Sequence, residues 1–416
     1  MESSAIHPEQ QPTSEAARIT SIDVLRGFAV LGILVMNVQS FSMPIAAYSN
    51  PPAYGDLTGA NLWTWVVAHV FVSQKMITIF SMLFGAGILL MAERAEASGR
   101  ATLLHYRRMG WLILFGLLHA HLLWYGDILY AYGMCGLVAY LFRNRPPASL
   151  FLWGVVFIAI ASAMSLAFGL MVQSAPPQAV AAFERDWRPP ADEIAAEIDA
   201  YRGGWLDQLR LRSEQAFSLE TLPFFTIIGP DVLGRMLLGM ALYRLGVFSA
   251  RRSRGFYLAL IALGFLVGVS ISALGVYLNF AAGWDVRYSF FFGSQLNGWA
   301  SILVALGWVG AVMLACQTRA LAPVTRRLAA VGRMAFSNYI LQTLICTTIF
   351  YGHGLGLFGR VDRVGQIAIV VGVWVVQLAI SPIWLRNFHY GPLEWLWRSL
   401  TYWRPQPFRR VSKGPA

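Results

Sequence analysis

A lysine lies inside one of the most apolar stretches of the sequence, FVSQKMITIF at residues 71–80. The chain of 416 residues has only one other lysine, which lies in its C-terminal tail. Gln74, Thr78 and Ser81 accompany Lys75 at the spacing that forms a polar stripe along a helix. An ammonium group at hydrocarbon depth either extends to the membrane surface or faces a water-filled or protein-lined cavity. We favour the cavity, in which Lys75 would neutralise a phosphate or carboxylate with Gln74 beside it.

The first apolar run, SIDVLRGFAVLGILVMN, carries three polar residues that are spaced for different roles. Asp23 and Arg26 share a helix face, and their plain interpretation is a local ion pair that anchors the helix end, with Ser21 or Asp23 as the N-cap. Asn37 lies roughly 16 Å further along the helix axis, in the outer half of the membrane. An amide at that depth either joins helices by hydrogen bonds or orients a reacting carbonyl, and the first role is the commoner one.

A third group of polar residues lies in LLHAHLLWYGDILYAYG. His119 and His121 are two residues apart on a helix and point in nearly opposite directions, so they cannot jointly hold a metal ion. Asp127 follows a glycine and is well placed as the N-cap of the next helix. The alternative role is catalytic: Asp127 would orient His119 as a general base at the outer mouth of the protein.

A fourth group lies in GRMAFSNYILQTLICTTIFYGHG. Asn338 and Gln342 share one helix face, and Arg333 precedes them at the start of the run. Hydrogen bonding between helices is the default explanation for such amides, and lining of a cavity is the alternative.

The composition identifies the elements that must position these groups. With 57% hydrophobic and 13% charged residues, the chain is far more apolar than a soluble domain. Apolar runs of about 18 residues or more recur from end to end, and such runs can cross a hydrocarbon core of about 30 Å. The sequence therefore predicts an all-α, polytopic integral membrane bundle. We expect about ten transmembrane helices, at residues 22–43, 62–92, 108–125, 127–143, 148–172, 222–246, 256–280, 294–316, 334–352 and 365–387. The second range is too long for one straight crossing and is expected to tilt or to extend out of the bilayer.

The net charge of +11 is distributed as in a membrane protein, not as in a nucleic-acid-binding protein. Arginines cluster in alternate loops between the apolar runs, and such loops are cytoplasmic by the positive-inside rule. This pattern predicts a multi-pass protein of the inner, cytoplasmic membrane, surrounded by the lipid bilayer and with both termini in the cytoplasm. The three cysteines show no metal-ligand spacing, so we expect neither a metal site nor a disulfide framework.

The sequence divides into a tail, one membrane domain and a second tail. Residues 1–20 are polar and expected to be disordered, and the run after them is expected to remain as the first transmembrane helix because no convincing signal-peptide cleavage site follows it. Residues 21–388 form a single transmembrane domain. Its insertion at 173–221 is predicted to form one or two amphipathic helices on the outer face, interrupted by two glycines, as a cap over a site or as a plain connector. Residues 389–416 form a basic, aromatic tail suited to the cytoplasmic headgroups.

These stretches together resemble the YeiB family of bacterial membrane proteins, a domain of unknown function. The resemblance covers almost the whole chain in order. It rests on IDVLRGFAVLGILVMN, KMITIFSMLFGAG, GLLHAHLLWYGDIL, GRMAFSNYILQTLICTTIFYGHGLGLFG and GPLEWLW.

A more distant likeness is to membrane acyltransferases, including heparan-α-glucosaminide N-acetyltransferase. Their first helix starts with Asp-x-x-Arg-Gly and carries an Asn near its outer end, a pattern matched here by Asp23, Arg26, Gly27 and Asn37. The likeness implies an acyl-CoA donor such as acetyl-CoA bound from the cytoplasmic side and an unidentified acceptor reached from the other face. Those enzymes use a His in the following outer loop, whereas the corresponding loop here, SFSMPIAAYSNPPAYGDLTG, contains none.

Acyl transfer across the membrane is the leading functional hypothesis. His119 with Asp127 would then deprotonate the acceptor, and Asn37 would hold the acyl carbonyl. The phosphates of the donor, bound beside Asp23, would be balanced by Arg26, Lys75 and Arg333.

Two hypotheses from other classes use the same residues. In a transporter or channel for a small anionic solute, Lys75, Gln74, Asn338 and Gln342 would line the path of the solute. In a membrane scaffold, the polar residues would only join helices. The sequence leaves the oligomeric state open.

Overall fold

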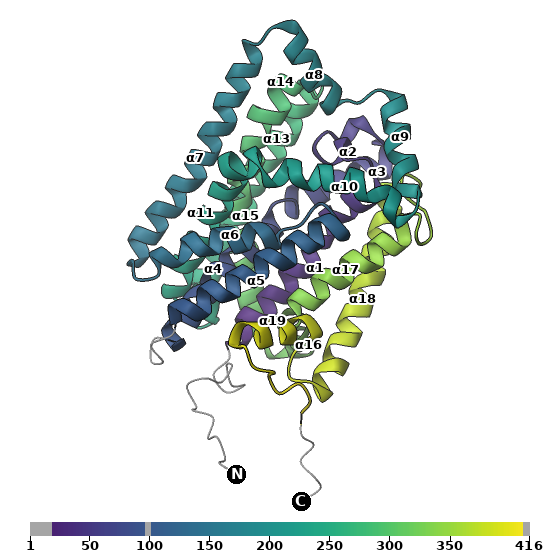
Figure 1. Cartoon of the computed structure of the whole chain (residues 1–416). Coiled ribbons are helices and arrows are strands. Elements are labelled where there is room, and N and C mark those ends of the chain that lie inside the picture. Colours follow the sequence, from purple (N-terminus) through teal and green to yellow (C-terminus); the bar gives the residue numbers. More distant parts are fainter. Residues whose placement is uncertain (1–18, 96–100, 411–416) are drawn as a thin grey trace, which may run out of the picture.

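The computed structural model describes residues 19–95 and 101–410 (Figure 1). These residues form helices and loops, with one isolated β-bridge between Phe388 and Arg409. Seven helical stretches are long and apolar enough to cross a membrane, and two shorter apolar helices accompany them. The prediction of an all-α membrane bundle is confirmed. Each of the ten ranges expected from the sequence falls on helices, while the number of crossings stays a prediction.

The helices follow one another along the chain with short connections. The first half contains α1 (Thr20–Ser42), α2 (Ala46–Ser49), α3 (Gly59–Phe71), α4 (Lys75–Ala95), α5 (Ala101–Leu122), α6 (Leu129–Ala139), α7 (Pro147–Gln173), α8 (Pro177–Trp187), α9 (Ala191–Arg202) and α10 (Trp205–Glu220). The second half contains α11 (Gly229–Arg244), α12 (Arg254–Ala262), α13 (Val269–Ala281), α14 (Val286–Tyr288), α15 (Ser294–Gln317), α16 (Ala322–Arg333), α17 (Ala335–Phe350), α18 (Arg363–Asn387) and α19 (Pro392–Tyr402). Three π-helical segments precede α11, α13 and α15, at Phe224–Ile228, Leu263–Gly268 and Ser289–Gly293.

Helix α1 lies at the centre of the bundle and packs against α4, α15, α16, α17 and α18. Its contact with α16 is a backbone contact through two glycines. A Cβ atom added to Gly27 would lie 2.0 Å from the carbonyl oxygen of Leu328, and one added to Gly332 would lie 1.9 Å from that of Asp23. Helices α4 and α11 meet in the same way, through Gly85 and Gly239. Small residues of this kind let membrane helices approach closely where lipid offers no hydrophobic driving force.

The long apolar range at 62–92 forms two helices that are joined by a turn. Helix α3 ends at Phe71 and α4 begins at Lys75, and Gln74 between them adopts a left-handed conformation with φ 64°. The expected tilted or extended single helix is therefore two helices joined by a turn. Lys75 consequently stands at the first position of α4 and not in the middle of a continuous helix.

The insertion at 173–221 forms three helices, α8, α9 and α10, where one or two were expected. The two glycines predicted to interrupt it do separate α9 from α10. Helix α9 is attached to the bundle by hydrogen bonds at its middle and at its C-terminal end. The backbone N–H of Ile45 donates to Glu197 (3.0 Å), and the Arg202 guanidinium donates twice to the carbonyl oxygen of Phe358 (2.7 and 2.9 Å). The insertion is thus docked on the loops that follow α1 and α17.

The segment expected to be a basic tail contains a docked helix. In α19, the Glu394 carboxylate accepts hydrogen bonds from the backbone N–H groups of Phe336 (2.7 Å) and Ser337 (3.1 Å), at the start of α17. The indole of Trp397 donates to the carbonyl oxygen of Arg108 on α5 (3.0 Å). Residues 389–410 therefore belong to the folded bundle, whereas the rest of this tail and the expected tail at 1–18 lie outside the described residues.

The arginine-rich loops gather around the start of α1. The Ser21 hydroxyl donates to the carbonyl oxygen of Phe248, in the loop after α11 (2.6 Å). Gln317, at the end of α15, donates to the same loop, and Arg244 donates to backbone oxygens at 143–145. Helices α16 and α19 lie at this end, and α8 and α14 lie at the opposite end (Figure 1). Loops assigned to one membrane face by their charge therefore lie together, and the identity of that face stays a prediction.

The glycine contacts of α1 generate the first testable prediction. Gly27→Ala places a methyl group against the backbone of α16, and we expect a loss of about 1–3 kcal/mol in stability because neither backbone can yield without moving its helix. Gly87→Ala in α4 is the matched control, since a Cβ at Gly87 meets no atom within 4 Å. The check is the melting temperature of the detergent-solubilised variants. Equal melting temperatures for the two variants would contradict the assigned role of Gly27.

Candidate functional site

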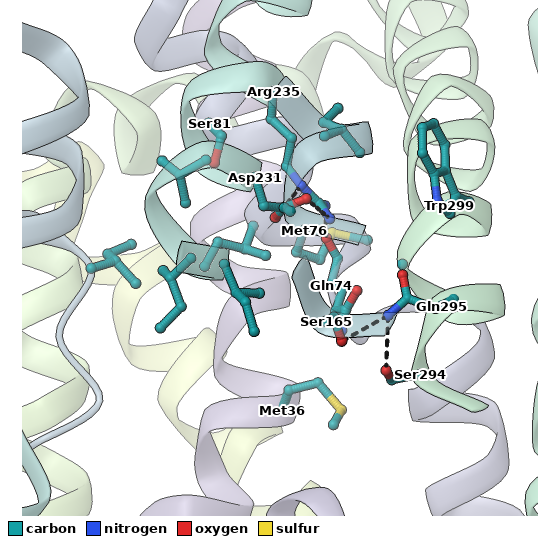
Figure 2. Close-up of a pocket in the computed structure, with 18 of the residues that line it drawn as sticks. Met36, Gln74, Met76, Ser81, Ser165, Asp231, Arg235, Ser294, Gln295 and Trp299 are labelled. Carbon is teal, nitrogen blue, oxygen red and sulfur yellow. Dashed lines mark hydrogen bonds and ion pairs between the residues drawn. The ribbon is translucent and has the colours of Figure 1, made fainter. Parts of the chain in front are cut away.

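A cavity of about 400 Å³ lies between α1, α4, α7, α11 and α15 (Figure 2). Most of its wall is apolar, with side chains such as Ile33, Met36, Met76, Ile158 and Val232. Its polar wall residues come from all five helices and from the turn before α4: Asn37, Gln74, Ser81, Ser162, Ser165, Asp231, Arg235, Ser294, Gln295 and Trp299. An apolar cavity with a few converging polar groups is the usual form of a small-molecule site.

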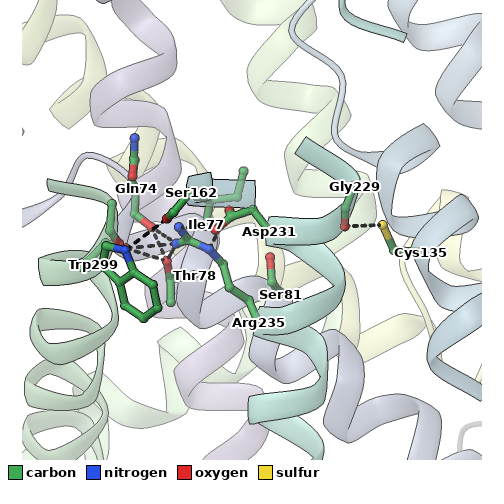
Figure 3. Close-up of polar contacts among 12 residues, drawn as sticks. Gln74, Ile77, Thr78, Ser81, Cys135, Ser162, Gly229, Asp231, Arg235 and Trp299 are labelled. Carbon is green, nitrogen blue, oxygen red and sulfur yellow. Dashed lines mark hydrogen bonds and ion pairs between the residues drawn. The ribbon is translucent and has the colours of Figure 1, made fainter. Parts of the chain in front are cut away.

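An ion pair on α11 forms the charged part of the cavity wall (Figures 2 and 3). Arg235 donates through Nη2 to Asp231 Oδ1 (2.9 Å) and through Nη1 to the hydroxyls of Ser301 (3.0 Å) and Thr78. The side chain of Arg235 is 5% exposed, and that of Asp231 is 30% exposed. The guanidinium is thus enclosed by α4 and α15, while part of the carboxylate remains accessible.

This ion pair was not predicted from the sequence. A sequence pattern that could have identified the pair is the spacing of Asp231 and Arg235. The two residues are four positions apart in GPDVLGRMLLG, inside an apolar run predicted to cross the membrane. Opposite charges at this spacing share a helix face and neutralise each other locally. Two charges at hydrocarbon depth are a functional-site indication by themselves.

Lys75 is fully buried and does not belong to the residues that line the cavity, in contrast to the expectation from the sequence. Its ammonium donates to the carbonyl oxygen of His69 (2.9 Å), to the Ser272 hydroxyl (3.1 Å) and to the Asn297 side-chain oxygen. These neutral oxygens come from α3, α13 and α15. Gln74, one residue earlier, does line the cavity, because its left-handed backbone turns its side chain away from that of Lys75.

The polar residues of α1 divide between the two ends of the helix. Asn37 lines the cavity. Asp23 and Arg26 form the predicted ion pair (2.8 Å) near the start of α1. The N-cap prediction is wrong, because the helix begins at Thr20 with Ile19 at the cap position and Ser21 bonded to the loop after α11.

The three cations expected to hold a CoA-like donor do not converge. Arg333 follows Gly332, which touches the backbone at Asp23, so Arg333 and Arg26 share one end of the bundle. The Arg333 guanidinium lies 3.5 Å from the carbonyl oxygen of His389. Lys75 lies further along the bundle, against α13 and α15. The cavity wall on α1 extends from Gly32 to Asn37 and does not include the Asp23–Arg26 pair.

His119 and Asp127 are in direct contact, as the catalytic interpretation required. His119 Nδ1 lies 2.8 Å from Asp127 Oδ1, and Nε2 lies 2.9 Å from the Thr343 hydroxyl on α17. Asp127 also accepts a hydrogen bond from the backbone N–H of Tyr130 in the first turn of α6 (2.7 Å), but the N-cap position itself is occupied by Ile128, one residue later than predicted. The His119 and Asp127 side chains are only 1% and 2% exposed and lie outside the cavity, although Ile128, the next residue, lines it.

Asn338 and Gln342 connect helices, which was their default explanation. The amide of Asn338 donates to the Ser381 hydroxyl on α18 (3.1 Å). The amide of Gln342 donates to the carbonyl oxygen of Val30 on α1 (3.1 Å) and to Gln377 on α18 (3.0 Å). Both side chains are buried and lie outside the cavity wall. They therefore join α17 to α1 and α18 and do not contribute to the site.

Comparison with known proteins gives relatives along the whole chain. A family described as "Protein of unknown function (DUF418)" matches residues 242–404. The chain is 35% identical over 390 residues to a protein of Escherichia coli (strain K12) named "Uncharacterized protein YeiB", covering 92% of this chain and 96% of the relative. It is 32% identical over 424 residues to "Uncharacterized protein YxaH" of Bacillus subtilis (strain 168), covering 97% and 99%.

The neutral partners of Lys75 lead to an asymmetric prediction. Asn297→Ala removes an acceptor from a buried ammonium, so we expect a loss of about 1.5–3 kcal/mol. Lys75→Met should cost less, because it removes the charge itself and leaves the Ser272–Asn297 hydrogen bond (2.7 Å) in place. The double variant should be more stable than Asn297→Ala alone. Thermal unfolding in detergent measures all three, and a larger loss for Lys75→Met than for Asn297→Ala would refute this account.

The ion pair on α11 gives a second prediction. Asp231→Asn leaves the enclosed guanidinium of Arg235 without its counter-charge and should lower stability. The loss should be below the about 3–5 kcal/mol typical of a fully buried pair, because Asp231 is 30% exposed.

An exposed pair of the same spacing, Arg210 and Glu214 on α10, provides the control. Glu214→Gln should leave the melting temperature unchanged, because water screens that pair. A similar effect of Asp231→Asn and Glu214→Gln would show that the pair on α11 is not electrostatically enclosed.

Proposed function

The chain belongs to the YeiB family of membrane proteins, and from this premise we propose that it binds an amphiphilic molecule with an acyl chain in the cavity and acts as a membrane acyltransferase. The observation that carries the proposal is the cavity itself. Its volume of about 400 Å³ and largely apolar wall suit an acyl chain, and its polar residues suit the group to which that chain is attached.

Asn37 supports acyl transfer as the reaction. Its amide lines the cavity and is the natural hydrogen-bond partner of an acyl carbonyl, whose oxygen gains negative charge during the transfer. The His119–Asp127 pair lies outside the cavity wall, next in sequence to the lining residue Ile128, and has the base-and-orienting-group geometry that deprotonation of an acceptor requires. The donor would be an acyl-CoA such as acetyl-CoA, with an acceptor still to be identified.

A second candidate function is transport of an anionic amphiphile. It is favoured by the break between α3 and α4, because interrupted helices at the binding site are typical of secondary transporters. The accessible polar atoms beside this break, from Gln74 and Asp231, lie in the cavity wall. In this function the cavity would hold the same kind of molecule without a covalent step.

The test places a larger side chain from α7 in the cavity. Ala161 of α7 lines the cavity, whereas Ala163 of the same helix is exposed and outside its wall. We expect Ala161→Phe to weaken binding of a spin-labelled fatty acid by about tenfold or more and Ala163→Phe to leave it unchanged. Equal binding by the two variants would exclude this cavity as the acyl site.

The reaction is tested by release of CoA from acetyl-CoA and palmitoyl-CoA by the purified protein, in which water takes the place of the acceptor and receives the acyl group, with Asn37→Leu as the variant. Acyl transfer predicts CoA release that Asn37→Leu lowers by about 10²-fold, the loss of one group that stabilises the developing oxyanion. Fatty-acid binding without CoA release, together with counterflow of the fatty acid in proteoliposomes, would favour transport over acyl transfer.

A further inference from the structure

We infer that the cavity takes its ligand sideways from the bilayer, through the seam between α7 and α15, and that the ligand is an acyl lipid whose headgroup carries hydroxyl or ammonium groups. The inference rests on the proposed function, because it concerns the same cavity. It adds the route of entry and the chemistry of the headgroup.

Two side-chain hydrogen bonds connect α7 to α15 across the cavity wall. The Trp299 indole donates to the Ser162 hydroxyl (3.0 Å), and the Gln295 amide donates to the Ser165 hydroxyl (3.1 Å) (Figures 2 and 3). All four residues line the cavity. Each helix contributes one turn to this contact, at spacings of three and four residues, so the two bonds lie one above the other along the seam.

Aromatic side chains at this seam lie in the cavity wall and are also partly exposed. Trp299 lines the cavity and is also 37% exposed, and Phe290, just before α15, lines the cavity and is 44% exposed. Exposed aromatic side chains on a membrane bundle face the lipid. Helix α7 packs along α11, and its Gly169 packs closely on Phe291 beyond the hydrogen-bonded turn. Between its contact with α11 and the contact of Gly169 with Phe291, α7 is therefore held to α15 by neutral hydrogen bonds. Such bonds contribute little in membranes and open at small cost.

The polar atoms inside the seam define the headgroup. The Nη groups of Arg235 are already engaged by Asp231, Ser301 and Thr78, so the guanidinium offers little to a ligand anion. The Asp231 carboxylate is 30% exposed and remains an acceptor on the cavity wall. A headgroup with hydroxyl or ammonium donors matches this acceptor, whereas a bare phosphate offers it no donor.

The experiment closes the seam reversibly in the full-length protein in lipid nanodiscs. Ser165→Cys and Gln295→Cys are combined in a background in which Cys135, Cys316 and Cys346 are replaced by alanine. A short bis-methanethiosulfonate linker joins the two thiols, and reductant releases it. Binding is measured by electron paramagnetic resonance with phosphatidylethanolamine, phosphatidylglycerol or phosphatidic acid labelled on the acyl chain, and by competition with octanoyl-CoA added to the water phase.

We expect the linked protein to take up labelled phosphatidylethanolamine or phosphatidylglycerol about tenfold more slowly than the reduced protein. The variant Ser162→Ala/Ser165→Ala, which removes both acceptors without a linker, should take them up faster than the wild type. The first two lipids should bind about tenfold more tightly than phosphatidic acid, which lacks a headgroup donor of this kind.

Uptake at the same rate in the linked and reduced states would overturn lateral entry. Displacement of the lipid by octanoyl-CoA is expected in both states, because the acyl-CoA donor of the proposed function reaches the cavity from the water phase, and its failure in both states would overturn acyl-CoA as the donor. Tighter binding of phosphatidic acid would overturn the headgroup assignment. Binding of no labelled lipid by the reduced protein, with an unchanged melting temperature, would overturn the proposed function, and this inference with it.

Discussion

Two buried cations, each held by oxygen atoms from neighbouring helices, determine how the helices around the cavity are arranged. Lys75 of α4 binds Asn297, and Arg235 of α11 binds Ser301, one turn further along the same face of α15. A buried cation without acceptors costs several kcal/mol, so these three helices cannot separate independently. Thr78 of α4 contacts both Arg235 and Ser301, so α4 carries a side chain of each group. The cavity lies where this polar contact prevents the helices from filling the space between them.

Close packing elsewhere keeps that space open. Glycines let α1 touch α16 and let α4 touch α11 by their backbones, so the remaining positions of these helices are fixed relative to one another. The contact between α7 and α15 is made by polar side chains and not by backbone packing. Helix α7 packs along α11 but meets α15 through hydroxyl, amide and indole groups, and its opposite face is largely exposed. The same bundle thus combines a rigid side, built from backbone contacts, with a side whose closure depends on a few weak bonds.

Much of the fold was predictable because it follows from local properties. Apolar runs long enough to cross the bilayer identified the helices, and the arginine pattern identified loops that do lie together. The short-range ion pair of Asp23 with Arg26 was predictable for the same reason, because it is fixed by spacing along one helix. The break before Lys75 was not predicted, because a left-handed residue such as Gln74 leaves no signature in an apolar sequence. The number of helices in the outer insertion was also underestimated.

The sequence by itself determined that this is a helical membrane protein, that it belongs to its family, and that Lys75, Asn37, His119 and Asp127 are unusual for their surroundings. Only the tertiary structure decided which of these residues share a site. The Lys75 ammonium donates to neutral acceptors more than 190 positions away in the sequence, on α13 and α15, and does not line the cavity, whereas Asn37 and the Asp231–Arg235 pair do. The physical reason is that a polar group in a membrane protein is defined by its partners across helices, and neither hydropathy nor spacing records which helices become neighbours.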